Sequence, residues 1–242
     1  MGLRGLFLAT ALWASVPALG HFLAVVPEAD FVKKREVKFK VEFTHPAEGG
    51  PAMPFEVERA TVYLYGKFYP VKLEKKGLTY EGSFKVVRPG VYQLVVEQKP
   101  YWEESEGLYI KQVAKVFVDA YGWEEGWDRP VGLKVEVVPQ VRPFGLWEGN
   151  TFVGRVYKDG KPLAGATVEV EYYNDRGLKY PVPVLTTQTL KTDERGYFYY
   201  TLPWSGWWGF SVLTEGQTHE GKPLELDAVL WIYAHPKPEG VR

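Results

Sequence analysis

The sequence contains no cysteine. Disulfide bonds, thiolate metal sites, haem attachment through cysteine and cysteine nucleophiles are therefore all excluded. Any bound metal ion would need imidazole, carboxylate, amine, thioether or carbonyl ligands. Histidine and methionine are also scarce, with 4 and 2 residues in a chain of 242. Each of these few residues can therefore be assessed individually as a candidate metal ligand.

An excess of charge of either sign is absent too. The chain has 29 basic and 30 acidic residues, and its formal net charge is −1. Without a basic cluster, nucleic acid is not expected as a partner. No serine stands in a G-x-S-x-G motif, and no pair of carboxylates is marked out by the sequence. We therefore expect a protein that is not an enzyme.

The sequence has no apolar run long enough to span a membrane, but it has a shorter one near the N-terminus. Residues 6–14 are mostly apolar, follow the basic residue Arg4, and precede a small-x-small pattern at Ala18-Leu19-Gly20. This order is typical of a cleavable signal peptide, and the run is shorter than the roughly 20 residues that span a bilayer. We expect residues 1–20 to be removed, leaving a soluble periplasmic or extracytoplasmic protein that begins at His21. The alternative is an uncleaved membrane anchor.

Strict alternation of apolar and polar residues dominates the rest of the chain. It occurs at residues 37–43, 133–137 and 168–172, and it indicates half-buried antiparallel strands. The 25 glycines and 18 prolines suit many short strands joined by tight turns. No window of a dozen residues has a helical stripe. The sequence therefore predicts an all-β protein made of two β-sandwich domains.

A break rich in proline and glycine at residues 142–145 divides the chain. We expect an N-terminal β-sandwich over residues 21–141, a second β-sandwich over residues 142–235, and a flexible tail over residues 236–242. In the second unit an Asp159-Gly160 turn and a Thr192 to Gly196 turn lie about thirty residues apart. This arrangement resembles the carboxypeptidase-regulatory or transthyretin-like sandwich, which hosts many functions.

The histidines are the candidate metal ligands. As the first residue after cleavage, His21 would combine a free α-amine with an imidazole, a chelate that suits Ni, Cu, Co or Zn. His45 follows an alternating strand, in a loop that also contains Glu48 and Met53, and His219 lies in a polar connection between strands. We predict that His21, His45 and His219 bind one metal ion at the seam between the two domains, where pockets usually form.

Plainer interpretations of the histidines stay open. His21 could simply follow the cleavage site, His45 could be a hydrogen-bonded turn residue, and His219 could be solvated. His235 lies in a segment rich in proline and lysine, which we expect to be disordered and to take no part in metal binding.

Six blocks of sequence, spread in order over nearly the whole mature chain, resemble one known family. They begin at His21-Phe22 and continue through residues 43–53, 88–103, 120–139, 142–163 and 206–231, including FTHPAEGGPAM and GWWGFSVLTEGQTHEGKPLELDAVLW. Together they resemble the periplasmic nickel/cobalt uptake transporter component family, long catalogued as a domain of unknown function. His21, His45 and His219 fall within these blocks, and His235 does not.

This resemblance implies an extracytoplasmic accessory protein that binds Ni²⁺ or Co²⁺ as cargo for the membrane components of an energy-coupling-factor-type importer. The ligand types alone do not separate these ions from Cu²⁺ or Zn²⁺. A copper-binding periplasmic protein therefore stays open as an alternative. So does a structural or carbohydrate-facing β-sandwich in which the aromatic residues do the work.

Overall fold

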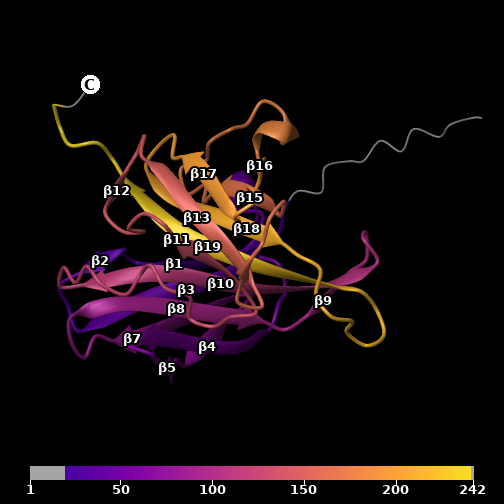
Figure 1. The fold of residues 1–242 in the computed structure, drawn as a ribbon, viewed down its shortest axis with the longest axis horizontal. Coiled ribbons are helices and arrows are strands. Elements are labelled where there is room, and N and C mark those ends of the chain that lie inside the picture. The colour runs from indigo at the N-terminus through magenta and orange to yellow at the C-terminus, as the bar shows by residue number, and fades with distance from the viewer. Residues whose placement is uncertain (1–19, 241–242) are drawn as a thin grey trace, which may run out of the picture.

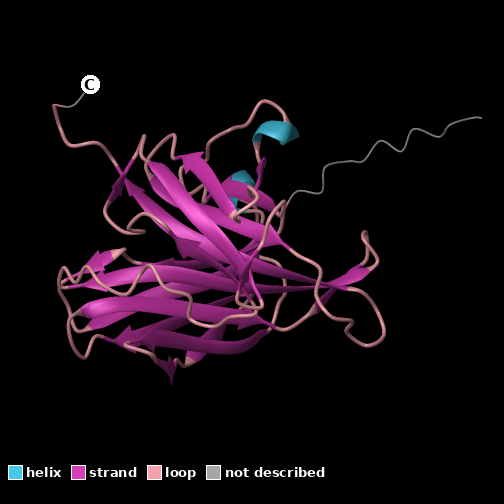
Figure 2. Ribbon diagram, in the orientation of Figure 1, coloured by secondary structure: helices cyan, strands magenta, loops and turns pink. Residues whose placement is uncertain are grey.

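The computed structural model describes residues 20–240. The predicted signal peptide, except for Gly20, lies outside the described residues. Within them the chain forms nineteen strands and two single-turn 3₁₀ helices, η1 (Pro46–Glu48) and η2 (Pro183–Leu185). Figure 2 shows the predominance of strands over helices. The all-β prediction is confirmed. No helix in this part of the chain has the length and apolar character needed to cross a membrane.

Three sheets contain these strands. The first has the order β1 (Phe22–Pro27), β3 (Glu36–Thr44), β7 (Thr79–Lys85), β6 (Leu73–Lys76). The third has the order β11 (Val135–Pro139), β13 (Thr151–Lys158), β14 (Lys161–Pro162), with β17 (Tyr197–Thr201) paired to β13. All three alternating segments of the sequence contribute strands, namely β3, β11 and β15 (Thr167–Tyr172).

The second sheet has eleven strands and runs through the middle of the molecule. Its main path is β16 (Gln188–Lys191), β15, β18 (Gly206–Leu213), β19 (Leu224–His235), β10 (Leu108–Ala120), β8 (Gly90–Gln98), β4 (Val57–Leu64), β5 (Lys67–Pro70). Three short strands pair beside this path: β2 (Phe31–Val32) and β9 (Tyr101–Glu103) with β10, and β12 (Leu146–Trp147) with β19.

The parallel pair β10–β19 joins the two halves of the chain. Its register runs from Tyr109 opposite Leu224 to Val116 opposite Trp231. In Figure 1 the early strands, indigo to magenta, lie in the lower part of the molecule, and the orange and yellow strands lie above them. The predicted boundary after residue 141 falls between β11 and β12, yet β11 pairs with β13 of the second half. Two strand pairs, β10–β19 and β11–β13, thus cross the predicted boundary.

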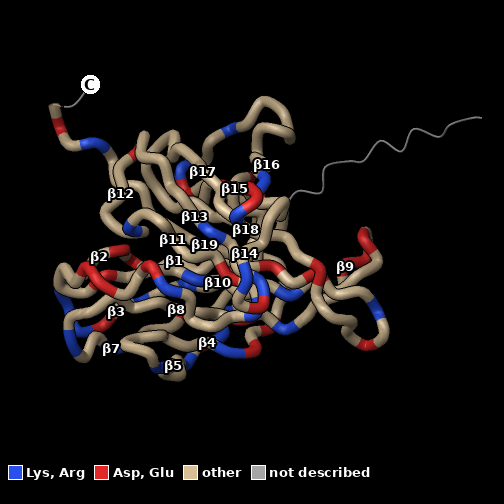
Figure 3. The backbone as a smooth tube through the Cα atoms, in the orientation of Figure 1, with Lys and Arg blue, Asp and Glu red and all other residues tan. Residues whose placement is uncertain are grey.

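Two hydrophobic clusters lie on the two faces of the central strands. Along β8, Tyr92 and Leu94 belong to the first cluster, whereas Val91 and Val95 belong to the second. Successive side chains of a strand point to opposite faces, so one strand serves both cores. Basic and acidic residues are interspersed over the visible backbone in Figure 3, as expected of a chain with net charge −1.

Candidate metal centre

His21 lies immediately before β1, and His45 lies immediately after β3. The two strands are antiparallel, and their last registered pair is Phe22 opposite Thr44. Continuing that register by one residue puts His21 opposite His45, and cross-strand neighbours of this kind contact each other. Their ring centroids are 4.2 Å apart, with an interplanar angle of 36°. The structure therefore brings two of the three predicted ligands together.

The His21 ring is partly enclosed by aromatic residues. Its centroid is 5.4 Å from that of Phe43, and its Nδ1 lies 3.3 Å from the hydroxyl of Tyr101. The Glu103 carboxylate lies 3.7 Å from the same nitrogen. Burial and then the neighbouring His45 lower the pKa of His21, while Glu103 acts in the opposite direction. The neutral imidazole, which is the form that binds metal, is thus favoured.

The backbone of His21 is held by Gln112 of β10. The Gln112 side chain donates to the His21 carbonyl at 2.7 Å and accepts from the amide of Leu23 at 2.6 Å. The same side-chain nitrogen also donates to a carboxylate oxygen of Asp227 at 3.1 Å. This clamp fixes the start of β1 against the central sheet.

The second histidine is held by a loop clamped from the other half of the chain. His45 is the N-cap residue of η1, and its Nδ1 lies 3.2 Å from the carbonyl oxygen of Gly20. Within η1, Ala47 donates its amide to Glu171 at 3.0 Å, and its carbonyl accepts from the side chain of Asn174 at 2.8 Å. Glu171 and Asn174 therefore support the site, although sequence reasoning did not identify them.

The other two candidate ligands of this loop, a glutamate and a methionine, do not lie beside the histidines. Glu48 is exposed, and Met53 packs against the first hydrophobic cluster. Within the described residues, no group of three or more histidine, aspartate or glutamate side chains has an arrangement that could hold a metal ion. A metal bound by His21 and His45 would need another donor.

His219 is not part of this pair. Its ring packs on Tyr109 at 4.7 Å, and Tyr109 in turn packs on Trp102 at 5.2 Å. The residue before Trp102 is Tyr101, which contacts His21. Because adjacent residues of a strand face opposite sides, His219 and His21 lie on opposite faces of the β9–β10 ribbon. The predicted three-histidine site is not assembled in this structure.

His235 is ordered, so the expectation of disorder at this residue is wrong. It is the last residue of β19, and its Nε2 lies 2.9 Å from a carboxylate oxygen of the buried Asp30. This ion pair satisfies the imidazole and the carboxylate together. Its contact with Asp30 gives His235 a structural role at the end of β19.

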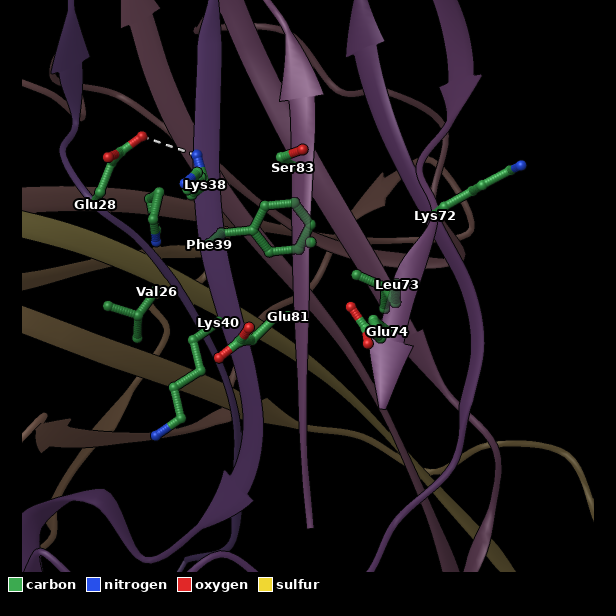
Figure 4. Close-up of a pocket in the computed structure, with 12 residues that line it drawn as sticks. Val26, Glu28, Lys38, Phe39, Lys40, Lys72, Leu73, Glu74, Glu81 and Ser83 are labelled. Atoms are coloured by element: carbon green, nitrogen blue, oxygen red, sulfur yellow. Dashed lines mark hydrogen bonds between the residues drawn. The ribbon is translucent and has the colours of Figure 1, made fainter. Parts of the chain in front are cut away.

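A wide groove in the described part of the chain lies elsewhere. It has a volume of about 740 Å³ and is formed by residues of β1, β3, β6 and β7. Figure 4 shows Phe39 across its floor, with lysine and glutamate side chains such as Lys38, Lys40 and Glu81 around it. No histidine lines this groove. It therefore offers no imidazole ligand for a metal ion.

Comparison with solved structures gives only remote similarities. An Escherichia coli alpha-2-macroglobulin activated by porcine elastase is 12% identical, with 89% of this chain and 20% of that chain covered and a TM-score of 0.29. A Ca²⁺-stabilised adhesin with which an Antarctic bacterium binds ice is 12% identical, with 90% and 49% covered and a TM-score of 0.25. This chain thus spans a fifth to a half of these proteins, and similarity at this level indicates neither a shared fold nor a shared function.

None of the curated proteins compared with this chain matches it. Residues 18–216, however, match a protein family described as a domain of unknown function. The matched range includes His21 and His45 and ends before His219. The chain therefore belongs to the family of the domain of unknown function DUF4198.

Proposed function

We propose that this protein is exported to the periplasm or another extracytoplasmic space, where it captures Ni²⁺ or Co²⁺ for a membrane uptake transporter. The observation that carries the proposal is the contact between His21 and His45, with ring centroids 4.2 Å apart. This contact occurs at the residue that would become the N-terminus after cleavage behind Gly20.

Cleavage would supply the donor that the pair lacks. The peptide group between Gly20 and His21 contains the oxygen that lies 3.2 Å from Nδ1 of His45. Breaking this bond and releasing residues 1–20 removes that oxygen and frees the His21 amine a few ångströms from His45. The amine and Nδ1 of His21 then form a chelate, and His45 adds a third nitrogen. Water or the nearby Glu103 carboxylate can complete the coordination.

The choice of metal rests on two arguments of different kinds. Three nitrogen donors suit Ni²⁺, Co²⁺, Cu²⁺ and Zn²⁺, whereas they suit Ca²⁺ and Mg²⁺ poorly. Within the first group, nickel and cobalt are favoured by the resemblance to the nickel/cobalt uptake transporter component family. Delivery to the membrane components of an importer rests on the same resemblance.

The proposed scaffold of this site has two sandwiches, of which the second is transthyretin-like. In support, Asp159 and Gly160 adopt positive φ angles of 50° and 73°, as the turn between β13 and β14 requires. The turn before β17 is closed by hydrogen bonds from the amides of Arg195 and Tyr197 to the Asp193 carboxylate.

Calorimetric titration with Ni²⁺ and Co²⁺ tests the proposal. The protein should begin at His21, with no extra residue, and should be compared with His21→Ala and His45→Ala. Each substitution removes a direct ligand, so each should weaken binding more than the roughly 10–100-fold loss typical of a supporting residue. A form that begins at Ala18 should also bind weakly, because its free amine is displaced from His21.

His219→Ala is the matched control, since it removes a histidine on the other face of the β9–β10 ribbon. It should leave the affinity unchanged, and a loss equal to that of His45→Ala would return His219 to the site. Equal binding by wild type and the His21 and His45 variants would defeat the proposal. Tight binding of Cu²⁺ alone, lost in both variants, would move the function to copper handling.

A further inference from the structure

A small acidic cavity lies beside the peptide group of Gly20 and His21. It has a volume of about 90 Å³, and its lining includes Gly20, Gln112, Glu106, Glu169, Glu225 and Asp227. The carboxylates come from β15, β19 and the turn before β10. His21 also lines this acidic cavity, but the cavity's carboxylates are not among the proposed metal ligands.

Strand alternation explains why the carboxylates converge. Asp227 and Glu225 precede Val229 and Trp231 on the same face of β19, and those two apolar residues belong to the first hydrophobic cluster. The face that packs this core therefore becomes acidic at its edge, where β1 begins. In β15, Val168 and Val170 belong to the second cluster, so Glu169 between them points to the same side as the acidic edge.

The acidic cavity lacks a counter-charge. Asp227 is only 1% exposed, and its Oδ1 is buried without any hydrogen-bond partner. Among the described residues, Glu169, Glu225 and Asp227 form no ion pair with lysine, arginine or histidine. Burial raises the pKa of all three carboxyl groups, with repulsion from neighbouring carboxylates as a further cause, and that of Glu169 reaches about 7. A buried, unpaired carboxylate is costly.

Gly20 and His21, whose peptide bond would be cleaved, both line this cavity. One nitrogen of Gln112 donates both to the His21 carbonyl, at 2.7 Å, and to Asp227, at 3.1 Å. On the other side, a Cβ atom added to Gly20 would lie 2.3 Å from an oxygen of Glu169. Gly20 thus occupies space directly beside Glu169, and its removal would open the acidic cavity to the new N-terminus.

We propose that this acidic cavity binds the α-ammonium group created at His21 by cleavage after Gly20. The positive charge supplies the missing partner of Asp227 and Glu169, and it anchors the first residue of the mature chain to β15 and β19. The cleavage thereby joins the N-terminus to the second half of the protein. The inference shares with the proposed metal site the cleavage after Gly20, but it needs no bound metal.

The two roles of the nitrogen belong to different states of the protein. As an ammonium group it is held by the carboxylates, and as a neutral amine it binds metal beside His45. Metal binding to an amine releases a proton, so the two states exchange when an ion arrives. The acidic cavity therefore holds the ammonium group only in the metal-free mature protein.

The test compares four proteins in the presence of a metal chelator. Two begin at His21 and two begin at Ala18, and each pair consists of wild type and Asp227→Asn. At pH 6.5 the α-amine is charged, since its reference pKa is about 7.7–8. In the wild type, cleavage should raise Tm by roughly 4–8 °C, the scale of a charge-assisted contact in a chain of this size. In Asp227→Asn this gain should fall by at least half.

A second measurement reports on the amine itself. Acylation of the α-amine, followed by mass spectrometry, should be faster in Asp227→Asn than in wild type among proteins that begin at His21. Should Asp227→Asn not fold, Glu169→Gln provides the same comparison. Equal Tm gains and equal acylation rates in wild type and variant would overturn the proposal.

The metal titrations distinguish this failure from failure of the proposed function. If cleavage raises Tm equally in wild type and Asp227→Asn while Ni²⁺ or Co²⁺ still binds, only the ammonium site is rejected. If the Tm gain depends on Asp227 but no metal binds, only the metal site is rejected.

Discussion

Replacing Lys115 with Met should destabilise the protein by about 3 kcal/mol. Lys115 on β10 and Glu136 on β11 form an ion pair of 3.1 Å, with side chains 3% and 2% exposed. Breaking such a buried pair costs about 3–5 kcal/mol, because one charge is left buried and unpaired. We expect a destabilisation at the lower end of this range, because Glu136 keeps the hydrogen bonds that it accepts from the amides of Val131 and Gly132. Thermal unfolding should show Tm lower by roughly 6–12 °C.

The same strand offers a matched control. Lys111 also lies on β10, but its nearer partner, Glu58, is 47% exposed, and its second partner, Glu97, is 3.9 Å away. Pairs of this exposed kind contribute only about 0–1 kcal/mol. Burial lowers the pKa of Lys115, while Glu136 acts in the opposite direction. Removing both charges with Lys115→Met and Glu136→Leu should therefore recover part of the loss. The reasoning is refuted if Lys115→Met costs no more than Lys111→Met.

Two further predictions concern the supports of the fold and of the site. The hydrogen bond that the His235 imidazole donates to the Asp30 carboxylate raises the pKa of His235. Its stabilisation is therefore present below about pH 6.5 and is lost as the pH rises through the raised pKa. The Tm difference between wild type and His235→Gln should therefore be larger at pH 5.5 than at pH 8.5, and a difference that does not change with pH would contradict this. Asn174→Ala removes the hydrogen bond to the Ala47 carbonyl and should weaken Ni²⁺ binding about tenfold by loosening His45. Calorimetric titration with Ni²⁺ checks this, with Tm measured to confirm that the variant is folded. Unchanged affinity would show that the hydrogen bond from Asn174 to Ala47 is dispensable for metal binding.

The strands were predictable because alternation is a local property of the sequence. Residues 37–43 and 168–172 lie within β3 and β15, since each pattern exposes one face and buries the other. The joining of the halves through β10 and β19 was not predictable in this way. Parallel pairing of strands about 115 residues apart (Tyr109 with Leu224) leaves no local pattern, because both strands are buried on both faces over much of their length.

The candidate site was predictable in part. His21 and His45 were identified from their positions at a cleavage site and a strand end, and their contact follows from the β1–β3 register. That register could not be derived from the alternation alone, because a shift of two residues preserves the inward face of each strand. His219 was included because its loop also follows a strand. Which face of the β9–β10 ribbon its loop covers depends on pairings that the sequence does not display.

The alternation in β15 also shows how a correct pattern can lead to an incomplete interpretation. Val168 and Val170 face the second core as expected, and the glutamates that alternate with them, Glu169 and Glu171, would ordinarily face solvent. Instead Glu171 is only 1% exposed and binds the loop of His45, while Glu169 lines the acidic cavity. From the second half of the chain, Glu171 thus holds the loop of His45, while Glu169 lies beside Gly20. Cleavage of that one peptide bond would free a nitrogen between a histidine pair and unpaired carboxylates, so that metal binding and N-terminal anchoring would begin with the same event.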